Sequence, residues 1–248
     1  MKKTAVIIII LLISLFAALM TTNRRHDNRV VAFLVIASDG PEYDAMKAVW
    51  IERWRRRGRA LPDAHLWFLY GDGAVSAPSE HDRTYPSVRE SLIPGILNKT
   101  VLAMRDCLAE TNADVVIRTN LSSVYLWDRT AAFLERWRGD VAGLSPDGGG
   151  HIGGCNMIMS RRAVQWLVDH EHLLDRGKFD DVAISRAFYK NGFRVDGSVP
   201  RCDVLEDGKR FVSGKRPYFH IRFKQWDRQK DVEEMRTYIY KRNTRRRR

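Results

Sequence analysis

The chain has 248 residues, of which 44% are hydrophobic, 10% aromatic and 29% charged. This composition excludes an intrinsically disordered chain, a collagen and a small disulfide scaffold, and the length suits one large domain or two small ones. The 42 lysines and arginines outnumber the 30 aspartates and glutamates, so the formal net charge is +12. Only one segment is apolar enough to enter a membrane, which excludes a transporter with several spans.

That segment is an uncharged apolar run over residues 5–20, which follows Lys2 and Lys3. Extended through Thr22, it approaches the roughly 20 residues that a helix needs to cross a bilayer. We therefore expect a cytoplasmic tail over 1–4, a signal anchor over 5–22 and a stem over 23–29, ahead of a domain outside the cytosol. A cleaved signal peptide has the same outline and remains an alternative, as does a buried soluble helix.

The rest of the chain alternates between apolar runs and segments of helical spacing. Its first half predicts, in order, a strand over 30–38, a helix over 42–56, a strand over 65–70, a surface loop over 74–88, a helix over 92–108 and a strand over 113–118. Its second half predicts a helix over 126–137, a strand over 141–144, a glycine-rich turn over 148–154, a strand over 155–160, helices over 161–174 and 179–191, strands over 193–199 and 218–222, and a helix over 232–241. Residues 30–241 thus form one predicted domain, and 242–248 a basic disordered tail.

Strands that alternate with helices predict an α/β fold with a mainly parallel central sheet and helices on both faces. Ligands of such folds bind at the carboxyl ends of the strands. Four segments are therefore candidates for a site: residues 120–123, the glycine-rich residues 148–154, the pair Asp180–Asp181 at a helix start, and residues 220–222.

Three of these segments also have a purely structural interpretation. The glycine run lacks the spacing of a dinucleotide or P-loop motif, so it can be a plain turn. Asp180 and Asp181 can simply stabilise the helix N-terminus, as carboxylates do. One carboxylate is enough for that, so the second could instead serve as a general base. A single histidine such as His220 is more often a hydrogen-bonded structural residue than a ligand.

The cysteines and the charge give weaker indications. Cys107, Cys155 and Cys202 have no zinc-site spacing, so they form either one disulfide with one thiol left over or three buried thiols. The positive charge is not concentrated in one patch; part of it lies in residues 53–59 and 242–248, which is typical of a solvated face and a tail. Basic residues interleaved with exposed aromatics are not found, which argues against nucleic acid, while an anionic lipid surface or sugar nucleotide could use some of the charge.

The order of these segments resembles the GT-A glycosyltransferases of the β1,3-galactosyltransferase and Fringe group, and the resemblance covers residues 30–223. It rests on the signal anchor, MKAVWIERW at 46–54, Glu90–Ser91, LNKT at 97–100, Cys107, the strand and turn at 116–122, the glycine turn and strand at 153–160, Asp180–Asp181–Val182 and a late His220. It implies that Asp181, with Asp180 beside it, is the general base that deprotonates an acceptor hydroxyl for inverting attack on the anomeric carbon. It also implies that Asp39 holds the nucleotide base and that Asn120, Ser122, Gly153 and Gly154 line the donor site.

One departure from the family's pattern concerns the metal. The family's Asp-x-Asp binds a divalent cation that bridges the donor diphosphate, and carboxylate oxygens suit Mn²⁺ or Mg²⁺. Here Asn120 and Ser122 stand at those positions and carry no charge. Three interpretations follow: Lys99, Arg118 or Arg222 neutralises the diphosphate without a metal, other groups including His220 hold the metal, or the fold binds sugar without transferring it.

The resemblance thus predicts a single-pass type II membrane protein with its domain in the ER or Golgi lumen, or a secreted protein if the N-terminal segment is cleaved. Its predicted activity is hexosyl transfer from a nucleotide-sugar, a UDP-sugar in this family, to a hydroxyl of a glycan or glycoprotein. Two alternatives stay open. The chain could be a non-catalytic carbohydrate-binding protein on a degenerate GT-A fold, or a basic protein that interacts with a membrane surface.

Overall fold

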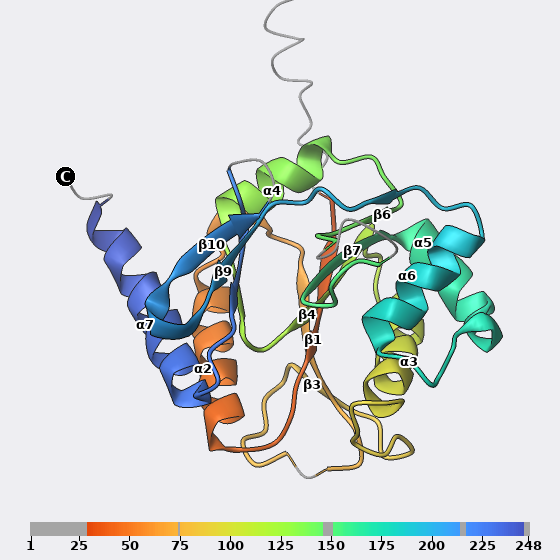
Figure 1. Ribbon diagram of the computed structural model, residues 1–248, viewed down its shortest axis with the longest axis horizontal. Coiled ribbons are helices and arrows are strands. Elements are labelled where there is room, and N and C mark those ends of the chain that lie inside the picture. Colours follow the sequence, from red (N-terminus) through yellow and green to blue (C-terminus); the bar gives the residue numbers. More distant parts are fainter. Residues whose placement is uncertain (1–28, 74, 146–150, 214–216, 246–248) are drawn as a thin grey trace, which may run out of the picture.

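The computed structural model of this chain describes residues 29–73, 75–145, 151–213 and 217–245 (Figure 1). The predicted tail, signal anchor and all but the last residue of the stem lie outside these ranges. Within them, no helix combines the length and the apolarity that a membrane span requires.

The main sheet has seven strands in the order β3-β2-β1-β4-β7-β6-β8. Their bounds are β1 Val31–Ile36, β2 His65–Tyr70, β3 Asp82–Thr84, β4 Val115–Asn120, β6 Val141–Ala142, β7 Asn156–Ser160 and β8 Val195–Asp196. The strands from β3 to β4 are parallel, β7 is antiparallel to both of its neighbours, and β6 is parallel to β8. Every residue of β1 is buried because helices cover both of its faces, as its unbroken apolar run predicts. The predicted mainly parallel α/β sheet is confirmed.

A second sheet of four strands lies against one face of this core, in the order β10-β9-β11-β5. Its strands are β5 Ser123–Tyr125, β9 Arg201–Val204, β10 Arg210–Ser213 and β11 His220–Phe223. One face packs into the apolar core through Val124, Cys202, Val204, Ile221 and Phe223. Because side chains alternate along a strand, the register places polar residues together on the other face, where His220 is paired with Arg201 and Tyr125, and Arg222 with Asp203 and Ser123.

The helices form two layers around the main sheet. They are α2 Pro41–Arg55, α3 Gly95–Glu110, α4 Trp127–Arg136, α5 Arg161–Asp169, α6 Asp180–Lys190 and α7 Arg228–Arg245. Figure 1 shows α2 and α7 side by side on one side of β1, and α3, α5 and α6 gathered on the other. Each layer has its own apolar cluster, one around Phe33, Trp50 and Trp54, the other around Leu34, Met104 and Phe188.

Several elements differ from the sequence prediction. The short strand β3 lies inside the expected loop, and the sequence pattern does not predict β5, β9 and β10. Their sequences carry no continuous apolar run; β9, for example, alternates Arg201, Cys202, Asp203 and Val204 because only one of its faces meets the core. Helix α7 extends to Arg245, into the range expected to be a disordered tail. All three cysteine thiols are buried and none forms a disulfide.

Candidate functional site

Arg118 connects three other predicted site residues at the carboxyl end of β4, namely Asn120, Gly154 and Asp180. Its side chain is 4% exposed, and Nη1 donates to Asn120 Oδ1 at 2.6 Å and to the carbonyl of Gly154. Nη2 lies 2.7 Å from Oδ2 of Asp180, which opens α6. Asn120 is the last residue of β4 rather than part of the following loop, so strand geometry sets its direction.

Asp181 is held next to this cluster by two backbone amides. The Gly154 N–H donates to Oδ2 at 2.9 Å and the Val182 N–H donates to Oδ1 at 2.9 Å. A Cβ atom on Gly154 would stand 2.7 Å from Arg118 Nη1 and 3.1 Å from Asp181 Cβ, so only glycine fits between the two side chains. Asp181 remains partly exposed, and its carboxylate is thus both oriented and accessible.

Asp180 has a different environment from its neighbour. Its side chain is 8% exposed and faces the Arg118 guanidinium. Burial raises the pKa of Asp180, and the nearby positive charge of Arg118 opposes part of that shift. Of the two predicted catalytic carboxylates, only Asp181 is therefore available to a substrate.

Lys99 is wholly buried beneath the carboxyl ends of β1 and β2. Its Nζ donates to the Ala37 carbonyl at 2.9 Å and forms an ion pair with Glu90. The other carboxylate oxygen of Glu90 accepts from the Gly71 N–H at 2.7 Å. Burial lowers the pKa of Lys99, with Glu90 opposing the shift. The charges of Lys99 and Arg118, both predicted to face the donor diphosphate, are thus each neutralised by a carboxylate of the protein.

Arg222 differs from these two cations. It is half-buried on the polar face of the second sheet, and it forms no ion pair in the part of the chain that the structure describes. Its Nε is buried without a hydrogen-bond partner there. The neighbouring Arg201 instead forms a two-point ion pair with Asp203, at 2.7 and 2.9 Å, and donates to Cys155 Sγ at 3.0 Å.

His220 lies on the same face, with no exposed surface. Its Nε2 is 3.1 Å from Ser123 Oγ, and its ring centroid is 4.9 Å from that of Tyr125. Burial, with the positive charges of Arg201 and Arg222, lowers the pKa of His220 well below its usual value. The imidazole is therefore neutral and enclosed.

These residues do not fit a hard divalent cation. Asn120 and Ser122 are neutral, and the Asn120 oxygen and the Asp180 carboxylate both face the Arg118 guanidinium. Among the described residues, no group of three or more His, Cys, Asp or Glu side chains could hold a metal. The prediction of His220 as a metal ligand gains no support from its surroundings.

The remaining predicted donor residues lie outside this cluster. Asp39 is exposed after β1, where its carboxylate accepts from Ser76 Oγ at 2.6 Å, and this hydrogen bond lowers the pKa of Asp39. Ser122 is half-buried, and its carbonyl accepts from the Phe223 N–H at 2.9 Å. The Gly153 N–H donates to the Leu144 carbonyl at 2.9 Å. Residues 148–150 of the glycine run lie outside the described residues.

Sequence reasoning does not single out Glu90, Arg201 or Asp203 as site residues. The alternation of charged and apolar residues at 201–204 is the available signal for the latter two. Glu90 enters only as part of a family motif. Its role depends on the approach of Lys99 and Gly71, which lie 9 and 19 positions away along the chain.

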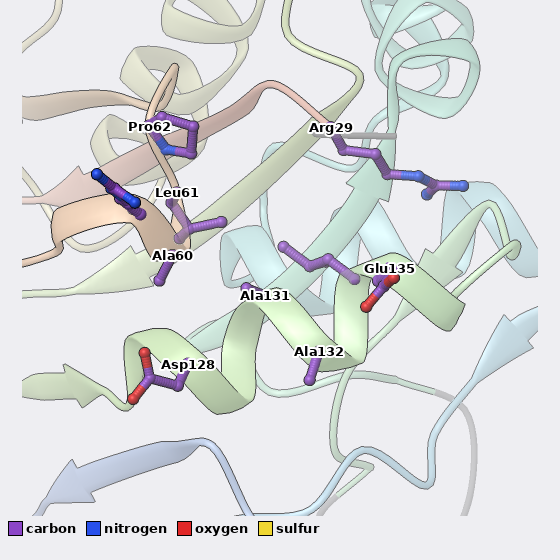
Figure 2. A pocket seen from close by; sticks show the side chains of 10 residues that line it. Arg29, Ala60, Leu61, Pro62, Asp128, Ala131, Ala132 and Glu135 are labelled. Carbon is purple, nitrogen blue, oxygen red and sulfur yellow. The ribbon is translucent and has the colours of Figure 1, made fainter. Parts of the chain in front are cut away.

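A cavity of about 600 Å³ lies at the opposite end of the main sheet (Figure 2). Figure 2 shows Arg29 and the segment from Ala60 to Pro62 facing Asp128 and Glu135 of α4 across it. Since Arg29 precedes β1 and Pro62 precedes β2, this cavity adjoins the amino ends of the strands. It is therefore separate from the cluster around Arg118.

Comparison with known proteins supports the fold. No protein-family model and no curated protein sequence matches the chain. A crystal structure of a glycosyltransferase involved in glycosylation of the major capsid of PBCV-1 matches with a TM-score of 0.53 and 9% identity, covering 84% of this chain and 99% of the other. Two structures of LgtC also match, one of an active-site mutant and one of the galactosyltransferase in complex with donor and acceptor sugar analogs. Their TM-scores are 0.47 and 0.44 and their identities 10% and 12%; each match covers 84% of this chain and 95% of LgtC. The first of these matches shows that the chain has a GT-A-like glycosyltransferase fold. Its membership of the β1,3-galactosyltransferase and Fringe group stays a prediction.

Proposed function

We propose that this chain is a glycosyltransferase that moves a sugar from a nucleotide-sugar, a UDP-sugar by the family resemblance, to a hydroxyl of a glycan or glycoprotein. The observation that carries the proposal is the placement of Asp181. In a glycosyltransferase fold, its accessible carboxylate is fixed by the Gly154 N–H beside the carboxyl end of β4. Ligands of open α/β sheets bind at that edge.

The proposed reaction inverts the anomeric centre. An Asp181 oxygen accepts the proton of the acceptor hydroxyl as the hydroxyl oxygen bonds to the anomeric carbon of the donor. The bond from that carbon to the diphosphate oxygen breaks, and the nucleoside diphosphate leaves with the electron pair. Charge develops on the leaving phosphate, where a positive group stabilises it most.

Arg222 is the cation best suited to that phosphate. Lys99 and Arg118 are wholly or almost wholly buried and each already faces a carboxylate, whereas Arg222 is half-buried and forms no ion pair among the described residues. We assign the two buried cations to the support of the donor site and Arg222 to direct contact with the donor.

We also propose that residues 5–22 anchor the domain in the ER or Golgi membrane with the domain in the lumen. The uncharged apolar run in the sequence supports this assignment. A glycan or glycoprotein acceptor is consistent with that compartment.

The experiment uses the full-length chain in detergent micelles. UDP- and GDP-sugars are titrated by calorimetry, and release of the nucleoside diphosphate is measured with the sugar nucleotide that binds. Asp181→Asn is expected to bind that donor but to lose turnover. The control Asp175→Asn, on the loop before α6, is expected to keep both donor binding and turnover. Turnover at the wild-type rate in Asp181→Asn would exclude Asp181 as the base. Absence of binding to every nucleotide-sugar would instead favour a non-catalytic carbohydrate-binding protein.

A further inference from the structure

The Arg118 guanidinium stands between three acceptors that come from different parts of the chain. Nη1 serves Asn120 Oδ1 and the Gly154 carbonyl, and Nη2 serves Asp180. A cation that is 3% exposed is stable only when it is compensated in this way. The guanidinium therefore fixes the positions of all three groups.

Gly154 transmits this arrangement to Asp181. Arg118 holds the carbonyl of Gly154, and the N–H of the same residue donates to Asp181 Oδ2 at 2.9 Å. The missing side chain lets Arg118 and Asp181 approach Gly154 from two sides. A continuous chain of contacts thus runs from Asp180 through Arg118 and Gly154 to Asp181.

We propose that the Arg118 guanidinium occupies the place of a divalent metal in this site without contacting the donor phosphate, which Arg222 meets, and that Asp180 is a positioning residue that acts through Arg118 and Gly154 on the Asp181 carboxylate. This inference rests on the proposed function only in taking Asp181 as the base. It assigns different roles to the two adjacent aspartates: one holds the cation and the other meets the substrate.

The arrangement also disfavours a metal on electrostatic grounds. The Asn120 oxygen, at one position of the family's Asp-x-Asp by the resemblance, and the Asp180 carboxylate beside it are both directed at the positive charge of Arg118. A divalent ion placed between them would meet the guanidinium at close range and be repelled by it. The nearby Glu90 carboxylate is already neutralised by Lys99 of α3, so it offers no free negative charge to a metal.

The first test uses UDP as the probe on the full-length protein in detergent. UDP affinity measured with EDTA is expected to equal that measured with Mn²⁺ within about threefold. UDP binding that requires Mn²⁺ would overturn Arg118 as the cation in place of a divalent metal.

The second test measures UDP release from the bound UDP-sugar as a function of pH. Asp180→Asn is expected to lower kcat roughly 10–100-fold while UDP affinity changes less than about threefold. It should also move the acid limb of the rate profile to lower pH, because Arg118 then stands beside Asp181 with no countercharge from Asp180. A loss of structure alone would not shift that limb, and an unchanged kcat and limb would overturn the positioning role.

The third test is independent of activity, so it separates a failure of this inference from a failure of the proposed function. Hydrogen exchange of the peptide that contains Gly154 is expected to quicken roughly tenfold in Asp180→Asn and in the charge-conserving Arg118→Lys. The control Asp140→Asn breaks a surface pair with Arg162, whose side chain is 73% exposed, and should leave that peptide unchanged. Unchanged exchange in Asp180→Asn and Arg118→Lys would refute the connection even if UDP binds.

Discussion

Glu90→Gln should destabilise this fold far more than its half-exposed position suggests. The substitution removes only the negative charge, because a glutamine oxygen can still accept the hydrogen bond from the Gly71 N–H. It leaves the Lys99 ammonium, whose side chain has no exposed surface, with the Ala37 carbonyl as its remaining partner. Breaking a buried ion pair from one side typically costs about 3–5 kcal/mol.

The protonation of Lys99 sets an upper limit to this cost. If the unpaired ammonium costs too much, Lys99 can lose its proton and become neutral in the folded protein. From an ordinary lysine pKa of 10.5, that deprotonation costs about 5 kcal/mol at pH 7, so Glu90→Gln cannot cost more. At pH 9 the same limit falls to about 2 kcal/mol, since each pH unit is worth about 1.4 kcal/mol. Because burial lowers the pKa of Lys99 in the folded state, stability rises with pH from the folded pKa up to the unfolded one. The loss caused by Glu90→Gln should therefore be larger at pH 7 than at pH 9.

Denaturant unfolding of both proteins at these two pH values measures the effect. At pH 7 the expected loss corresponds to a fall in Tm of roughly 6–20 °C. Glu110→Gln is the matched control, because Glu110 pairs with Arg83 at 2.9 Å while both side chains are exposed, and such pairs are worth about 1 kcal/mol or less. A free-energy loss in Glu90→Gln no larger than that of the control, or one of the same size at pH 9, would refute the enclosed Lys99–Glu90 ion pair as the cause.

Two further predictions concern the second sheet and the turn beside the site. The folded state keeps His220 neutral below pH 6.5, whereas the unfolded chain takes up a proton on this side chain. Between pH 7 and pH 5 the free energy of unfolding of the wild type should therefore fall by about 2 kcal/mol more than that of His220→Gln, as measured by urea unfolding. Equal losses in the two proteins would contradict the enclosed neutral imidazole. Gly143→Ala would place a Cβ in overlap with Ile152 Cγ2 and 2.7 Å from the Asn156 carbonyl, so we expect a loss of about 1–3 kcal/mol by the same assay. Gly73→Ala, which meets nothing within 4 Å, should stay within about 0.5 kcal/mol of wild type, and similar values for the two variants would contradict this packing.

The sequence predicted the central elements well because their burial is uniform. The apolar run predicted as a strand at 30–38 contains the fully buried β1, and the helical spacing of residues 42–56 matches α2 within one residue at each end. It predicted the second sheet poorly, since β9 and β10 are short and have only one face in the core. An alternating strand of four residues has too few apolar positions to be recognised without its partners.

For the site, sequence alone indicated which segments follow the strands and which residues there carry chemistry. It named Asp181, Asp180, Arg118 and Asn120, and the structure brings all four to one place. It did not indicate that Asp180 faces Arg118 while Asp181 faces the Gly154 amide. Adjacent residues in the first turn of a helix point about 100° apart, so their partners depend on which elements pack against each side of that turn.

The sequence by itself thus determined the α/β order, the central strands and the neutral residues Asn120 and Ser122 at the carboxyl end of β4, because these depend on local patterns and on residue type. Only the tertiary structure decided where each charge is compensated. Lys99 with Glu90, Arg118 with Asp180 and Arg201 with Asp203 are ion pairs enclosed by the fold, and among the described residues Arg222 is not in one. The physical reason is that the free energy of a charge depends on its burial and on its nearest partner, and burial arises from contacts across the fold even where the partner is near in sequence, as Asp203 is to Arg201.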